Sequence, residues 1–215
     1  VPHDLVPWWT AYRWYRSWAA DGTWDRIHDQ LRCAVRIAAG RDPDPSAAVL
    51  DAQSVKSSEG GQARGVDMGK KITGRKRHLI TDTLGLVLVA AVTAASVQDR
   101  PGGKAVLARL AAAFPSVALV WADGGYANSI DAGLVHWAGQ ELGLLLEIVR
   151  RSDDVKGFTV LPRRWVVERT FGWLVRNRRL ARDYERLTAC SEALIKVAMI
   201  RLMAARLAGH KTTWA

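Results

Sequence analysis

The stretch RRWVVERTFGWLVRNRRL, residues 163–180, places one carboxylate among arginines at helical spacing. At 100° per residue, Arg164, Glu168 and Arg179 fall on one face of a helix, and apolar side chains occupy much of the opposite side. Charged solvent-facing helices usually interleave both signs, yet residues 163–186 contain eight arginines against three acidic residues. The stretch therefore predicts an amphipathic helix whose polar face meets a polyanion.

Glu168 has two interpretations on this helix alone. The first is an i,i+4 ion pair with Arg164, which stabilises a helix by roughly 0.2–0.5 kcal/mol. The second is a metal-binding carboxylate beside a nucleic acid. The helix leaves both open, so the choice depends on acidic residues elsewhere in the chain.

Composition and charge narrow the classes of partner. The chain has 215 residues, 49% of them hydrophobic, which is enough for one cored domain with a smaller appendage. Its net charge of +10 favours nucleic acid or an anionic surface. Residues 83–98 form the longest uncharged run, which is too short to cross a membrane. Cys33 and Cys190 match no metal or redox spacing, so we expect a cytoplasmic protein.

The N-terminal 40 residues are rich in aromatic side chains. They contain five of the ten tryptophans: Trp8, Trp9, Trp14, Trp18 and Trp24. The spacing predicts a helical hairpin over residues 1–40, whose aromatic rings we expect to pack in a core rather than to stack on bases. Residues 41–46 form a turn-rich linker, residues 47–209 a second domain, and residues 210–215 a tail.

Two acidic residues belong to apolar runs typical of buried strands. Asp51 lies within the run 47–55, and Asp123 directly follows the run 117–122. A buried carboxylate is costly unless it is paired, hydrogen-bonded or bound to metal. Acids at the carboxyl ends of strands in α/β sheets also lie where ligands bind. Both residues therefore require a partner.

The remaining apolar patterns complete an α/β order. They predict strands at 78–83, 86–93 and 144–149, and helices at 104–114, 128–142 and 188–209. The order is three strands, helix, strand, helix, strand, helix, which is the order of a ribonuclease H-like mixed sheet flanked by helices. A small helical N-terminal region precedes it.

Residues 56–77 predict a loop with five glycines and a basic cluster. The cluster consists of Lys70, Lys71, Arg75, Lys76 and Arg77. The glycine spacing does not match a Walker A phosphate loop. Two interpretations stay open: a mobile loop that follows a nucleic-acid backbone, or a solvated loop without a partner.

Three motifs in this order resemble the DDE transposases of IS5-type bacterial insertion sequences. They are LDAQSVK at 50–56, WADGGY at 121–126 and VVERTFGWLVRNRRL at 166–180. The resemblance covers roughly residues 47–208, and DGTW at 21–24 is similar to the helical N-terminal region of the same family. It implies a DDE catalytic domain of ribonuclease H-like fold.

The resemblance implies that Asp51, Asp123 and Glu168 form the catalytic triad and hold two divalent ions, Mg²⁺ or Mn²⁺. Such ions prefer oxygen ligands, and a pair of them supports in-line displacement at phosphorus. Three other acids, Asp82, Asp99 and Glu147, lie outside the matched motifs and rank below the triad.

The family signature Tyr-x2-Arg-x3-Glu-x6-Lys is kept only in part. Arg164 and Glu168 match it, whereas Leu161 and Val175 replace the tyrosine and the lysine. We expect DNA contacts from the basic cluster of residues 70–77 and from five arginines of the motif stretch: Arg164, Arg169, Arg176, Arg178 and Arg179.

Three functions follow from these patterns. The first is a transposase that binds terminal inverted repeats and target DNA as a homo-oligomer at the nucleoid, cuts double-stranded DNA and joins strands. The second is a related metal-dependent endonuclease that cuts without transposing. The third is a non-enzymatic DNA-binding remnant. Metal-dependent strand joining would separate the first two.

Overall fold

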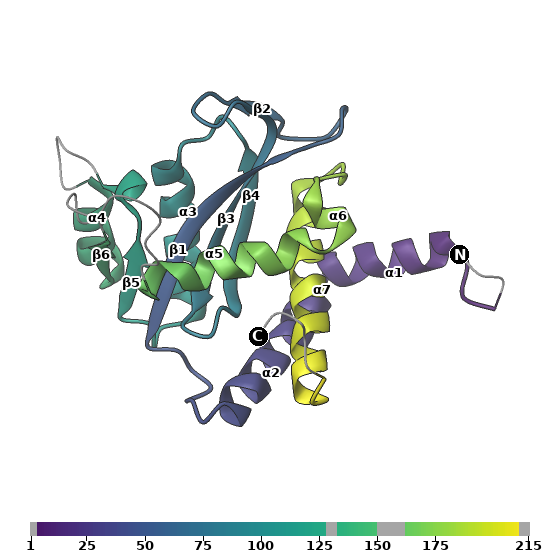
Figure 1. Ribbon diagram of the computed structural model, residues 1–215, viewed down its shortest axis with the longest axis horizontal. Coiled ribbons are helices and arrows are strands. Elements are labelled where there is room, and N and C mark those ends of the chain that lie inside the picture. Colours follow the sequence, from purple (N-terminus) through teal and green to yellow (C-terminus); the bar gives the residue numbers. More distant parts are fainter. Residues whose placement is uncertain (1–3, 128–132, 150–161, 211–215) are drawn as a thin grey trace.

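Strand β1 (Ala47–Lys56) is the central strand of a mixed six-stranded sheet in the computed structural model, which describes residues 4–127, 133–149 and 162–210 (Figure 1). The other strands are β2 (Gly65–Asp67), β3 (Ile72–Asp82), β4 (Val87–Ala94), β5 (Leu119–Ala122) and β6 (Leu145–Ile148). β1 pairs antiparallel with β3 and parallel with β5, β6 extends the sheet beyond β5, and β2 and β4 both pair with β3. The mixed sheet thus brings together strands that are distant in sequence.

Helices cover both faces of this sheet (Figure 1). They are α1 (Trp8–Ala20), α2 (Thr23–Ala38), α3 (Asp99–Ala113), α4 (Gly133–Leu142), α5 (Pro162–Val175), α6 (Arg178–Ala181) and α7 (Thr188–Leu207). Alternate residues of β1 enter two separate cores, because side chains of a strand point to opposite faces. Val49 packs with α2, α5 and α7, whereas Ala48 and Leu50 pack with α3 and α4. The predicted α/β class with a ribonuclease H-like sheet flanked by helices is confirmed.

The expectation of a basic loop up to residue 77 is wrong, because β3 begins at Ile72. The side chains of Arg75, Lys76 and Arg77 are buried and bind groups of the protein itself. Arg77 donates from Nη1 to the carbonyl oxygen of Leu180 over 2.7 Å. These three residues are therefore structural, and we withdraw them as DNA contacts. The charged sequence did not predict this part of the strand, because the groups that these side chains bind come from distant parts of the chain.

The buried ion pair of Arg75 and Asp183 attaches the C-terminal segment to β3. Arg75 Nη1 lies 3.0 Å from Asp183 Oδ1, and both side chains are almost fully buried. Arg75 also donates to Ser191 Oγ and to the carbonyl oxygen of Arg186. The chain between α6 and α7 is thereby held against the sheet.

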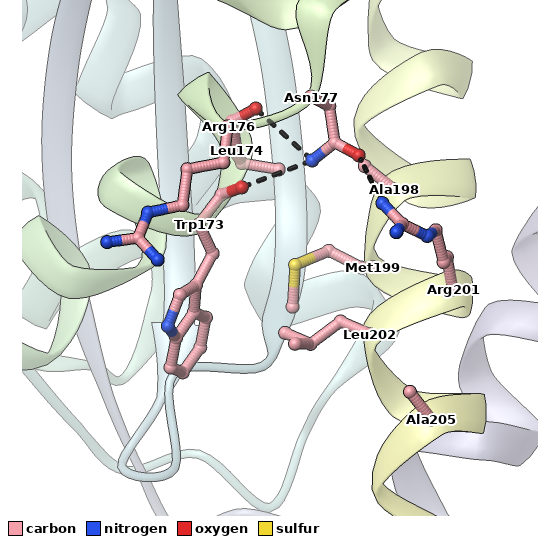
Figure 2. A pocket seen from close by; sticks show the side chains of 9 residues that line it. All are labelled: Trp173, Leu174, Arg176, Asn177, Ala198, Met199, Arg201, Leu202 and Ala205. Carbon is pink, nitrogen blue, oxygen red and sulfur yellow. Dashed lines mark hydrogen bonds between the residues drawn. The ribbon is translucent and has the colours of Figure 1, made fainter. Parts of the chain in front are cut away.

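The predicted helix over residues 163–180 is interrupted. α5 ends at Val175, and α6 starts at Arg178. The side-chain amide of Asn177 donates to the carbonyl oxygens of Trp173 and Leu174 (Figure 2), and its backbone amide also donates to that of Leu174. Carbonyl oxygens at the end of the helix thereby receive donors. Arg178 and Arg179 consequently belong to a separate short helix and do not continue the face of Glu168.

The expectation that the N-terminal aromatic rings lie in a core is also wrong. Trp8, Trp9, Tyr12, Trp14 and Trp18 are all exposed, and none of the residues of α1 is buried. α1 projects beyond α7, away from the sheet, so most of its length has no core beneath it (Figure 1). Only its C-terminal part contacts the body, where the ring of Trp18 packs on that of Trp24 with centroids 4.9 Å apart.

No helix in the described ranges has the length and apolar character that a membrane span requires. The start of the helix predicted at 128–142, the chain at 150–161 and the tail residues 211–215 lie outside the described residues.

Replacement of Asp183 by asparagine should lower the free energy of unfolding by about 3–5 kcal/mol, because it leaves the Arg75 guanidinium buried without a counter-charge. Chemical denaturation would measure this. Asp25→Asn is the matched control, since Asp25 pairs with Lys196 at the surface and its loss should cost about 1 kcal/mol or less. Equal losses in both variants would contradict a structural role for the buried pair.

Acidification should destabilise the fold through His78. Burial lowers the pKa of His78 to about 4, with the charge of Lys76 acting in the same direction and that of Asp99 opposing it. The unfolded chain binds a proton below its ordinary pKa of 6.5, so stability is lost as the pH falls from there towards 4.

His78→Gln should therefore reduce the loss of unfolding free energy between pH 7 and pH 5 by about 2 kcal/mol. Urea denaturation at both pH values provides the measurement. His136→Gln, which removes an exposed imidazole from α4, is the control. An unchanged pH dependence in His78→Gln would show that His78 is not the group responsible.

Candidate active site

Asp51 and Asp123 lie side by side because their strands are parallel neighbours. Leu50 of β1 is in register with Ala122 of β5, and each acid is the next residue along its chain. Asp51 shares its face of β1 with Val49, the face that α5 covers. β5 ends at Ala122, so Asp123 lies where the chain leaves the sheet. The topology thus places two carboxylates beneath α5.

The backbone after β5 orients Asp123. A short 3₁₀ turn, η1 (Gly124–Tyr126), begins directly after it, and Asp123 Oδ1 accepts a hydrogen bond from the Gly125 amide over 2.9 Å. This contact caps the turn. The second oxygen, Oδ2, faces Arg164 of α5 at 3.6 Å.

Glu168 is linked to the same cluster through Arg164. Arg164 Nη2 lies 3.4 Å from Glu168 Oε1, as well as near Asp123 Oδ2. The side chain of Glu168 is 40% exposed, and that of Arg164 is 23% exposed. The i,i+4 ion pair therefore exists, but its guanidinium also bridges to β5. Glu168 is not an isolated surface residue, because the arginine with which it pairs also contacts Asp123.

Burial destabilises the charged form of the Asp51 carboxylate. Its pKa is raised to about 6, chiefly by burial and also by the negative charge of Asp123. The Ala52 amide, Arg164 and Lys70 act in the opposite direction. Within the described ranges, the carboxylate of Asp51 accepts a single hydrogen bond, from the Ala52 amide at 2.7 Å.

The donor chemistry of this cluster fits a hard divalent cation. Asp51 and Asp123 supply adjacent carboxylate oxygens, which Mg²⁺ prefers, and Asp51 has unused acceptor capacity. In the part of the chain that the structure describes, three His, Cys, Asp or Glu side chains do not converge on one point. Arg164 instead joins the third carboxylate to the pair, so a guanidinium supplies the local positive charge.

A buried tyrosine and an ion pair lie near the acidic residues. Tyr126 is buried, and its hydroxyl has no hydrogen-bond partner among the described residues. Burial and the charges of Asp51, Asp99 and Asp123 raise its pKa well above the ordinary value. Lys76 binds Asp99 at 2.9 Å. The sequence did not predict this ion pair of Lys76, because residues 72–77 were expected to belong to a loop and instead form the start of β3.

The other two lower-ranked acids are engaged elsewhere. Asp82 is buried and accepts a hydrogen bond from Arg36 Nη1 at 2.6 Å. Glu147 accepts one from Trp121 Nε1 at 2.9 Å. Asp99 differs from them, since it would lie 3.6 Å from a Cβ placed on Gly125 and thus borders the turn after Asp123.

The basic residues expected at this site fall into different environments. Lys70 and Lys71 are exposed in the turn between β2 and β3, and Lys70 Nζ lies 3.5 Å from the carbonyl oxygen of Ala52, next to Asp51. Arg176 and Arg178 are exposed, whereas Arg179 pairs with Glu185. The guanidinium of Arg169 is half-buried and donates to the carbonyl oxygen of Leu84.

Comparison with known proteins identifies the family of the chain. The family described as transposase DDE domain matches residues 42–203. A putative transposase for insertion sequence element IS402 from Burkholderia cepacia is 32% identical over 135 residues, which span 58% of this chain and 60% of that relative. The matched family range contains Asp51 of β1, Asp123 directly after β5, and Glu168 of α5. The chain therefore belongs to the family of transposase DDE domains.

Proposed function

We propose that this chain acts as an IS5-type insertion-sequence transposase, which binds the terminal inverted repeats of its element, hydrolyses DNA phosphodiesters and joins the freed ends to target DNA. The observation that supports this is the position of Asp51 and Asp123 on parallel neighbours, with Arg164 linking Asp123 to Glu168. Asp51 and Asp123 are thus neighbours, and Arg164 connects the third acid to them.

Asp51, Asp123 and Glu168 would hold two Mg²⁺ or Mn²⁺ ions, which activate the attacking oxygen and stabilise the leaving oxygen when bound. Contacts within the chain position these carboxylates. β1 and β5 hold Asp51 and Asp123 at neighbouring register positions, and the Gly125 amide fixes one oxygen of Asp123. Arg164 offsets the repulsion between Asp123 and Glu168.

Contacts to DNA would come from basic side chains of the turn between β2 and β3 and from arginines of residues 164–179. Lys70 lies near Asp51, and Lys71 is its neighbour in the same exposed turn. The arginines proposed for backbone contact are Arg164, Arg169, Arg176, Arg178 and Arg179. Such contacts supply salt-dependent affinity without reading sequence. Joining two ends requires two active sites, so we propose a homo-oligomer on DNA at the nucleoid of the cytoplasm.

Asp51→Asn, Asp123→Asn and Glu168→Gln should each lower metal-dependent DNA cleavage by about a hundredfold or more, because each removes a charged ligand worth several kcal/mol in the transition state. Gel analysis of labelled element ends would measure cleavage, and thermal unfolding would check the fold. Glu141→Gln, at an exposed position of α4, is the control and should cleave normally. Normal cleavage by Glu168→Gln would remove Glu168 from the catalytic set.

Strand joining distinguishes a transposase from a nuclease. Pre-cut element ends with a free 3′-hydroxyl, incubated with supercoiled target DNA and Mg²⁺, should yield joined products, and EDTA should abolish them. Cleavage without joining would support the endonuclease alternative. Binding without either reaction would support an inactive DNA-binding remnant.

A further inference from the structure

A cavity of about 520 Å³ lies on the far side of α5 from the acidic cluster. It is bounded by the end of α2, the turn between β3 and β4, α5 and the end of α7. Its apolar wall consists of Val35, Ala38, Ala39, Leu84, Trp173 and Leu207, and its polar groups are Arg169, Arg206 and His210. No aspartate or glutamate occurs among the described residues that line it.

Trp173 is a closely packed residue of this wall. It is 7% exposed, and a Cβ added to Gly85 would approach its ring to 2.9 Å. Gly85 has a φ of +83°, so glycine is favoured there on backbone grounds as well. On the α7 side, Trp173 also borders a smaller cavity together with Met199 and Leu202 (Figure 2).

Two guanidinium groups lie over the Trp173 ring. The Cζ atoms of Arg169 and Arg206 are 4.9 and 4.5 Å from its centroid. Such contacts are favourable for each cation separately. Together they bring two positive charges close to one another, and burial with the charge of Arg169 lowers the pKa of Arg206.

These charges have no counter-ion within the described part of the chain. Arg169 donates from Nη2 to the Leu84 carbonyl, and its Nε is buried without a partner. Among the described residues, the guanidinium of Arg206 makes no hydrogen bond or ion pair, and its contact is with the Trp173 ring. Asp82 is the acid whose charge opposes the lowering of the Arg206 pKa, and its oxygens accept hydrogen bonds from Arg36 and from the amides of Leu84 and Leu86.

We propose that this cavity binds the phosphate group of a phosphoester, held by Arg169 and Arg206 beside Trp173. Paired guanidinium forks match the several oxygens of a phosphate, whose charge suits two cations better than a single carboxylate does. The apolar wall accommodates the organic part of the ester. The phosphate belongs either to a nucleic-acid backbone or to a soluble nucleotide. The inference does not depend on the catalytic proposal, because no acid of the proposed triad lines the cavity.

The test is a titration of the full chain with inorganic phosphate at constant ionic strength, followed by the indole N–H resonance of Trp173 in ¹H–¹⁵N spectra. Trp173→Phe assigns that resonance among the ten tryptophans. We expect a saturable shift. Arg206→Gln and Arg169→Gln should weaken it about tenfold or more, because each removes a charge-assisted hydrogen bond. Arg109→Gln, which removes an arginine of α3 outside the cavity, should leave it unchanged.

Arg206→Lys is the control for the case in which Arg206→Gln fails to fold. It keeps the charge without the planar fork, so binding should weaken less than in Arg206→Gln, with an unchanged thermal unfolding curve. No saturable shift in the wild type, equal weakening in Arg109→Gln, or an equal response to acetate would overturn the proposal.

Competition identifies the source of the phosphate. Displacement of inorganic phosphate by a short DNA duplex at a constant salt concentration would support the proposal and assign the site to a nucleic-acid backbone. Displacement by a deoxynucleoside monophosphate but not by the duplex would support it with a soluble ligand. Displacement by neither would overturn the assignment to a phosphoester and leave inorganic anion binding alone.

Discussion

The pairing of β1 along both of its edges is the constraint on which the rest of the structure depends. The parallel partner β5 brings Asp123 beside Asp51, and the antiparallel partner β3 attaches β2 and β4. Parallel neighbours require a crossover between them, and α3 supplies it over one face. α5 is then free to cover the other face, above Asp51. One strand therefore sets both the core and the position of the acids.

Charges buried along β3 connect this sheet to the helices that cover it. Arg75 binds Asp183, Arg77 donates to the Leu180 carbonyl, and Asp82 binds Arg36 of α2. Buried ion pairs add little net stability, but loss of one partner is costly. These pairs consequently define where the C-terminal helices and α2 dock, because any other docking would leave a buried charge uncompensated.

α5 separates two different chemical environments. Arg164 and Glu168 face the cluster at the ends of β1 and β5, while Arg169 and Trp173 face the cavity beneath the end of α7. The break at Asn177 ends the helix before the arginines of α6, so those arginines take independent positions. A single helix thus combines carboxylate and cationic sites that lie on opposite sides of its axis.

The sequence by itself determined the α/β class and most of the strands and helices, because apolar periodicity is a local signal. It also marked Asp51 and Asp123 as acids within or after apolar strands, whereas Glu168 joined them only through the resemblance of three motifs to a known family. Only the tertiary structure decided that Arg75, Lys76 and Arg77 are buried, since the groups that they bind are distant in sequence. It also decided that the α1 aromatic rings are exposed, because the same apolar pattern arises whether or not a core lies beneath it. The bridge from Arg164 to Asp123 likewise depends on how α5 docks on β5, which no local pattern encodes.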